Sequence, residues 1–240
     1  MNRPCKELKR IARANLNGHY GIPMGALLIA GCIPLVAELP FSMLQQETQP
    51  LMMTVMFYVA DFLIMLLSVV LSVGVMQIHL SIARKQKYDL GMVFCGFKNH
   101  PDRYIIVLLL ILCISLCGML PMMIGLLLFY WLGVSPLGIM ILIPCILISL
   151  VLTVLIQLRY ALVYFLVLDQ PNLTGIEALK LSQKLMKGNK GRLFYIYLSF
   201  LGMQLLCLLS FGIGSLWVSP YQSQTLANFY LDITQGIPTN

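Results

Sequence analysis

Two long apolar tracts constrain the fold of this chain more than any other feature. The first covers residues 20–74 and the second covers residues 104–168. A membrane-spanning helix needs about 20 apolar residues to cross roughly 30 Å of hydrocarbon, so each tract is long enough to cross twice. Each is interrupted once by a polar turn without lysine or arginine, at residues 45–50 and 133–136. The pattern therefore predicts two helical hairpins that enter a membrane and return.

The composition excludes a water-soluble domain. Hydrophobic residues make up 59% of the 240 residues, charged residues make up 10%, and the mean hydropathy is +0.87. Soluble domains carry about 25% charged residues. A soluble fold of this length could not bury so much apolar surface, and the remainder would drive association. We therefore expect an all-α, polytopic transmembrane helical bundle.

The basic residues predict the orientation of the bundle. Fifteen of the 16 lysines and arginines lie in three basic segments, at residues 1–19, 81–103 and 169–192. Lysine and arginine are enriched in the cytoplasmic loops of membrane proteins. We therefore expect a multi-pass protein of the cell (plasma) membrane, with a cytoplasmic N-terminus and with external turns at 45–50 and 133–136.

We interpret the whole chain, residues 1–240, as a single integral membrane domain with three repeated units. Each unit is an interfacial amphipathic helix followed by a membrane hairpin, which gives about six spans. The last span, from about Leu216, is the weakest, because Pro220 and several polar residues interrupt it; five spans is the alternative. The expected parts are an interfacial helix at 1–18, hairpins at 20–80, 104–168 and 193–233, a cytoplasmic segment at 81–103 and a cytoplasmic elbow helix at 169–192.

The first and third basic segments have the pattern of helices that lie on a membrane. At residues 4–17, apolar side chains occupy one helical face and cations surround the other. The third segment contains a capping box, in which Thr174 and Glu177 each satisfy a free backbone amide of a helix N-terminus. We therefore expect membrane lipids with anionic headgroups as partners. The predicted headgroup contacts are Lys6, Lys9, Arg10, Arg13, Lys184, Lys187, Lys190 and Arg192.

Two charged residues fall well inside the predicted spans. Asp61 lies about ten residues into the second span, and Arg159 lies about ten residues before the end of the fourth. A charge in hydrocarbon is costly and usually has a partner or reaches water. Two interpretations remain open. Each side chain extends to the nearer membrane surface, or Asp61 and Arg159 form an intramembrane polar pair inside the bundle.

Small residues in the spans predict where helices pack. Ser68 and Ser72 lie one turn apart in the second span. Pairs of small residues at this spacing allow two membrane helices to approach closely. We therefore expect this face to contact another helix.

Several segments carry a resemblance to a known family. The clearest is Met-Lys-Gly-Asn-Lys-Gly-Arg-Leu-Phe at residues 186–194, and the others are residues 7–18, 158–169, 177–182, 198–202 and 212–221. Through these segments the chain resembles the DUF975 family of bacterial integral membrane proteins over nearly its full length. The family name records an unknown function, so the resemblance implies a fold and no mechanism.

The motifs of common enzymes do not occur in this sequence. It contains no HExxH, GxSxG or GxxxxGK[ST] motif. We therefore expect no enzyme activity, no catalytic residues, no cofactor and no metal site. The basic segments accompany apolar faces, which fits anionic lipid better than nucleic acid.

Two classes of function remain. The first is a non-enzymatic scaffold, assembly or envelope component that binds a membrane-protein partner or a second copy of itself. The alternative is a permease or flippase-like transporter of a small molecule or lipid. Transport needs polar groups that converge at mid-depth, and few are present, so we favour the first class.

Overall fold

A computed structural model of the chain describes residues 3–44, 50–98, 101–133 and 135–234. The described residues form helices joined by short turns, and no strand occurs among them. This confirms the predicted all-α class. Most of the turn predicted to be external at residues 45–50 lies outside the described residues.

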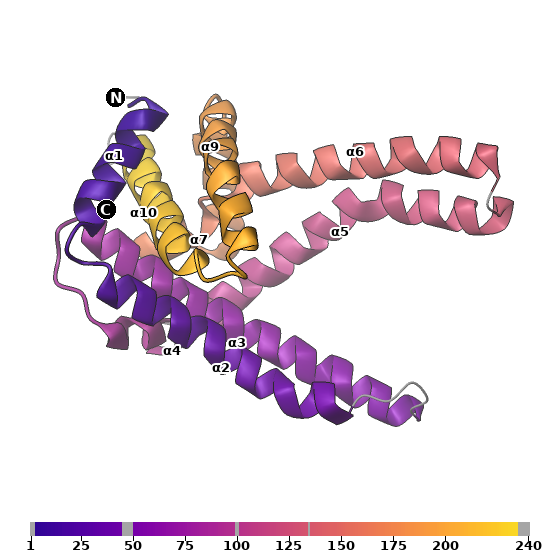
Figure 1. Cartoon of the computed structure of the whole chain (residues 1–240), viewed down its shortest axis with the longest axis horizontal. Coiled ribbons are helices and arrows are strands. Elements are labelled where there is room, and N and C mark those ends of the chain that lie inside the picture. Colours follow the sequence, from indigo (N-terminus) through magenta and orange to yellow (C-terminus); the bar gives the residue numbers. More distant parts are fainter. Residues whose placement is uncertain (1–2, 45–49, 99–100, 134, 235–240) are drawn as a thin grey trace.

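The helices follow one another along the chain with few intervening residues. Two hairpins and a third helical pair are connected to shorter helices (Figure 1). The helices are α1 (Cys5–Leu16), α2 (Gly21–Leu44), α3 (Leu51–Ala83), the short η1 (Leu90–Phe94), α4 (Cys95–Lys98), α5 (Pro101–Leu132), α6 (Pro136–Tyr160), α7 (Val163–Asp169), α8 (Gly175–Met186), α9 (Lys190–Leu209) and α10 (Ser215–Thr234).

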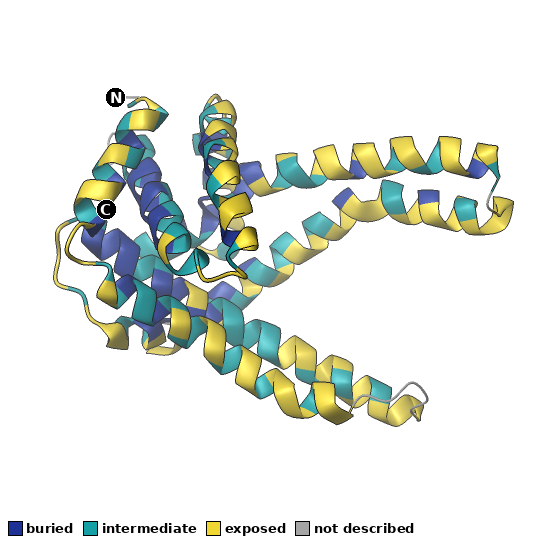
Figure 2. Cartoon of the chain, in the orientation of Figure 1, coloured by how far each residue is buried: buried dark blue, intermediate teal, exposed yellow. Residues whose placement is uncertain are grey.

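The hairpins α2–α3 and α5–α6 diverge from a shared base, as Figure 1 shows. Their outer halves are exposed on most faces, and burial is concentrated at the base (Figure 2). Among the described residues, five helices are long and apolar enough to cross a membrane: α2, α3, α5, α6 continued through α7, and α9. The chain therefore has the helices of a multi-pass membrane protein.

The expected sixth span, α10, is a complete helix but is less apolar than the other five. It forms a helical pair with α9, and this pair crosses the two hairpins instead of running beside them (Figure 1). α10 packs against α1, α3, α9 and α2. Its side chains therefore meet protein, and polar residues such as Gln224 and Thr225 are fully buried at 0% exposure.

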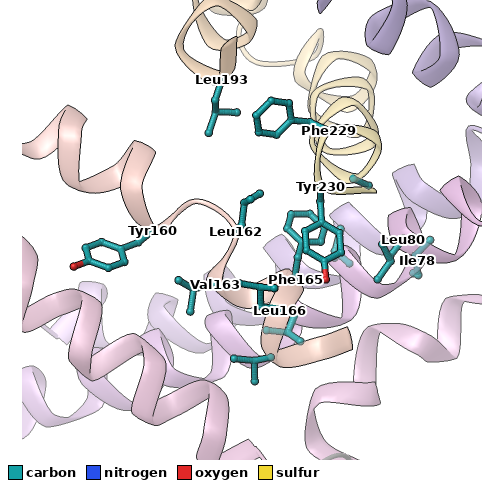
Figure 3. Close-up of a cluster of buried hydrophobic side chains, with 14 of the residues drawn as sticks. Ile78, Leu80, Tyr160, Leu162, Val163, Phe165, Leu166, Leu193, Phe229 and Tyr230 are labelled. Carbon is teal, nitrogen blue, oxygen red and sulfur yellow. The ribbon is translucent and has the colours of Figure 1, made fainter. Parts of the chain in front are cut away.

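The hydrophobic core lies at the base of the hairpins, around α7. Figure 3 shows Leu162 below Leu193 of α9 and Phe229 of α10, and Phe165 beside Tyr230 of α10. The rings of Phe165 and Tyr230 stack with their centroids 5.2 Å apart. α7 is thus surrounded by protein on several sides, which explains how seven residues remain helical between two turns.

The first helix lies where the sequence predicts it, but its apolar face does not lie in lipid. Leu8, Ala12 and Leu16 are fully buried, mainly against α10. The expectation that the apolar side of α1 faces lipid is therefore wrong. Amphipathic periodicity shows that one face of a helix is covered, and here the cover is another helix.

The elbow helix α8 begins with the predicted capping box. The Glu177 amide donates to the Thr174 hydroxyl, and the Glu177 carboxylate accepts from the Thr174 amide at 2.9 Å. The hydrogen bonds that the Thr174 amide and hydroxyl donate to the Glu177 carboxylate lower the pKa of Glu177. α8 buries Ala178 and Met186 against α5, α6 and α7. Like α1, α8 therefore covers its buried face with other helices of the chain.

Two glycines allow the segment after α3 to fold back onto α3. A Cβ atom at Gly74 would overlap the backbone of Val93 in η1, and one at Gly96 would lie 2.6 Å from the carbonyl oxygen of Val70. Only glycine leaves room for such an approach. This contact ties the second basic segment to the base of the bundle.

The α5–α6 hairpin packs through small residues. A Cβ atom at Gly125 would lie 2.6 Å from Cys145 Cβ. Two turns before Gly125 on α5, the carbonyl of Gly118 accepts a hydrogen bond from the Ser149 hydroxyl of α6 at 3.0 Å. Because lipid provides no hydrophobic force between helices, close approach and hydrogen bonds of this kind hold spanning helices together.

Candidate functional site

Most of the specific polar contacts lie at the base of the bundle. The Arg84 guanidinium, just after α3, donates to both carboxylate oxygens of Asp169 at 2.6 and 2.7 Å. The Tyr230 hydroxyl of α10 donates to the same carboxylate at 2.9 Å. Asp169 ends α7, so this cluster joins three elements that are far apart in sequence.

A second cluster joins the N-terminus to α9 and α10. Arg192 donates to the Asp232 carboxylate at 2.7 Å and to the Arg3 carbonyl at 2.6 Å. The Arg3 amide also donates to Asp232, at 3.2 Å. The Asp232 side chain is only 2% exposed, so its charge depends on these donors.

A buried polar pair holds α10 to α3. The His79 Nδ1 and Gln224 Oε1 atoms are 2.9 Å apart, and both side chains are buried. Nearby, the Gln224 Nε2 and Asn228 Nδ2 atoms have no hydrogen-bond partner among the described residues. These groups explain why α10 is polar: its polar side chains face α3 and not lipid.

Arg103, at the start of α5, fixes the turn between α7 and α8. Its guanidinium donates to the carbonyl oxygens of Leu173 at 2.5 Å and Gln170 at 3.3 Å. Like the clusters around Asp169 and Asp232, this contact satisfies backbone or side-chain groups within the chain. The charges at the base therefore stabilise the fold.

The structure does not bring Asp61 and Arg159 together. The Arg159 guanidinium donates to Gln183 of α8 at 2.7 Å. Asp61 lies on the other hairpin, in a groove that Glu38 also lines. Of the two interpretations, the intramembrane pair is therefore not formed, because Arg159 hydrogen-bonds Gln183 of α8 and no ion pair joins it to Asp61.

The groove along α2 and α3 is the first of two notable surface grooves. It has a volume of about 370 Å³, and Glu38, Asp61, Ser68 and Ser72 line it. The two serine hydroxyls donate to carbonyls of their own helix, at 2.9 and 2.7 Å. The predicted packing of another helix on Ser68 and Ser72 is therefore not present within this chain.

The second groove lies between α6 and α9 and has a volume of about 570 Å³. Its walls are apolar side chains of both helices, including Leu155 and Phe194. Lys190 lies at its edge, at the first residue of α9. No sequence motif marks this groove, because it depends on how α9 crosses α6.

The predicted headgroup contacts divide into three groups. Lys9 and Arg192 are used within the chain, because Lys9 donates to the Ser199 hydroxyl at 3.1 Å and lies 4.3 Å from the Phe200 ring centroid. Burial and the neighbouring Arg13 lower the pKa of Lys9. Lys190 is half-buried beside the second groove. The remaining five are exposed: Lys6, Arg10, Arg13, Lys184 and Lys187.

Comparison with known proteins identifies the family of this chain. No curated protein and no solved structure matches the chain. The family model described as "Protein of unknown function (DUF975)" matches residues 1–236. That match covers almost the whole chain and confirms the resemblance seen in the sequence. The chain therefore belongs to the DUF975 family.

Proposed function

We propose that this protein is a non-enzymatic scaffold of the cell membrane, whose two diverging hairpins bind other membrane proteins. The observation that carries the proposal is the contrast between the base and the outer halves of the two hairpins, α2–α3 and α5–α6, which we call the arms. At the base, Asp169 and Asp232 are engaged in contacts within the chain. The arms instead expose apolar faces along most of their length (Figure 2).

The geometry of the arms favours partner helices as their cover. Because the α2–α3 and α5–α6 hairpins diverge, each offers faces that the other does not cover (Figure 1). Lipid can cover such faces, but a partner helix gains additional packing and hydrogen bonds. The acidic groove of α2–α3, with Glu38 and Asp61, supplies hydrogen-bond acceptors for such a partner. A second copy of this chain is one candidate partner.

The alternative is a permease or flippase-like transporter. The α2–α3 groove is the observation in its favour, because Asp61 and Glu38 are carboxylates within long apolar helices. However, Arg159 lies on the other hairpin with Gln183, so opposite charges do not converge on a shared path. The scaffold is therefore the better-supported proposal.

We further propose that the base faces the cytoplasm, since 15 of 16 lysines and arginines lie in the three basic segments. In a variant without native cysteines, a single cysteine at Lys87 should resist a membrane-impermeant maleimide added to intact cells. A single cysteine at Ser135, in the turn between α5 and α6, should react. The reverse labelling pattern would overturn the orientation.

The scaffold proposal can be tested by site-specific photo-crosslinking in cells at native expression level. A photoreactive amino acid at Leu63 of α3 or Leu127 of α5, each 59% exposed, should give a discrete protein adduct. Leu205 of α9 is 55% exposed and serves as the matched control position. Leu205 belongs to neither hairpin, so the photoreactive group there should give lipid adducts.

Two results would contradict the scaffold proposal. The first is that all three positions yield lipid adducts only, which would leave the arms without a protein partner. The second is ion, solute or lipid flux in proteoliposomes of the purified chain that Asp61→Asn abolishes. That result would assign the α2–α3 groove to transport.

A further inference from the structure

The groove between α6 and α9 combines an apolar floor with a charged end. Val151, Leu155 and Leu158 of α6 form one wall, and Phe194 of α9 lies opposite. Both helices are long and apolar enough to cross a membrane. Hydrocarbon is therefore the medium that the apolar part of this groove meets.

One cation lines the groove, and a second follows the groove residues of α6 along the helix. Lys190 lines the groove directly. Residues 151, 155 and 159 are four positions apart, so they follow one row along α6, and Arg159 extends the apolar row by one turn. Arg159 hydrogen-bonds the neutral Gln183, and neither cation forms an ion pair within the part of the chain that the structure describes.

A glycine keeps the charged end of the groove open. Gly191 follows Lys190 and also lines the groove. A Cβ atom built there would have nothing within 4 Å, so the space beside Lys190 is unfilled. A headgroup can therefore approach Lys190 without displacing a side chain.

We propose that this groove binds one anionic phospholipid. An acyl chain lies along Val151, Leu155 and Phe194, and the phosphate lies at Lys190 and Arg159. The charge complementarity selects an anionic headgroup over a zwitterionic one. A partner helix fits less well, because apart from Lys190 and Gly191 the walls are valine, leucine and phenylalanine side chains, whereas membrane helices pack on small or hydrogen-bonding residues. This site does not depend on the scaffold role.

The proposal can be tested by native mass spectrometry of the full chain in detergent micelles. The purified protein is titrated with phosphatidylglycerol or with phosphatidylcholine that has the same acyl chains. The wild type should retain one phosphatidylglycerol more tightly than phosphatidylcholine. A cation near an anionic lipid strengthens binding about fivefold, so Lys190→Gln and Arg159→Gln should each weaken phosphatidylglycerol binding by about that factor.

Two further variants separate the groove from general surface charge. Gly191→Leu fills the open end and should weaken the binding of both lipids. Lys87→Gln removes one exposed charge from another basic segment and should leave the retained lipid unchanged. The melting temperature of each variant without added lipid shows whether it is folded. Because Arg159 also contacts Gln183, Lys190→Gln decides the outcome if Arg159→Gln lowers that temperature.

Three results would overturn the proposal. One is equal retention of the two lipids by the wild type. Another is a loss with Lys87→Gln as large as that with Lys190→Gln, which would show attraction to the surface as a whole. The third is a dimer that Gly191→Leu disrupts while lipid binding is unchanged, which would assign the groove to a second copy of the chain.

Discussion

Gly74→Ala should destabilise the protein by about 3 kcal/mol, near the upper end of the range for overpacked sites. The added Cβ would overlap the Val93 carbonyl, and it would lie 2.6 Å from Val93 Cα. Both atoms belong to the backbone, so no side-chain rotation relieves the clash. The η1–α4 segment must therefore move away from α3, although alanine by itself favours a helix over glycine by about 1 kcal/mol. Thermal unfolding in matched micelles measures the loss.

Gly202→Ala in α9 is the matched control, because a Cβ atom there has nothing within 4 Å. It should leave the melting temperature unchanged or raise it. A local readout is the thiol of Cys95, which directly follows η1, because burial raises its pKa. Displacement of the segment should return that pKa towards its ordinary value and accelerate alkylation of Cys95. Equal melting temperatures for the two alanine variants would contradict the close packing of η1 on α3.

Arg192→Gln should cost about 3 kcal/mol of stability, because it leaves the carboxylate of Asp232 buried without its cation. The side chain of Asp232 is 2% exposed, whereas that of Arg192 is 20% exposed. Asp232→Asn should therefore cost less, since the freed guanidinium can reach water. The double variant should be more stable than the sum of the two losses implies. Thermal or denaturant unfolding of all four proteins in the same micelles measures the coupling.

A matched control for this double-mutant cycle of Arg192 and Asp232 is Lys187→Gln, which removes an exposed cation from the same basic segment. Surface charges of this kind contribute little, so its stability should stay within about 0.5 kcal/mol of the wild type. A coupling energy near zero between Arg192 and Asp232 would contradict the prediction. It would show that the ion pair contributes nothing to holding the N-terminus, α9 and α10 together.

Local sequence features were sufficient to predict most of the helices. The two apolar tracts predict α2–α3 and α5–α6, because a bilayer requires helices of at least about 20 residues. Thr174 and Glu177 predict the start of α8, because both groups of a capping box lie within one turn of helix. These features depend on neighbouring residues, so no knowledge of the tertiary structure is needed.

The sequence contained a signal for the close approach of η1 that the predictions did not use. Gly74 is an isolated glycine inside an apolar helix, and such a glycine often marks a close packing contact. The signal gives the position of the contact but not its partner, which is Val93 of the next segment. Ser68 and Ser72 likewise have the four-residue spacing of helix-packing residues, but in this chain they line an open groove.

The charged residues show most clearly what only the tertiary structure decided. By itself, the sequence determined that the chain is an all-α membrane protein of the DUF975 family, through its tract lengths, its basic segments and its motifs. It did not determine that Arg159 meets Gln183, that Arg192 meets Asp232, or that α1 and α10 cover one another. Lipid and protein are equally good covers for an apolar face, so periodicity predicts that a face is covered without predicting its cover. Only the crossing of helices far apart in sequence decides which side chains come within a few ångströms of each other.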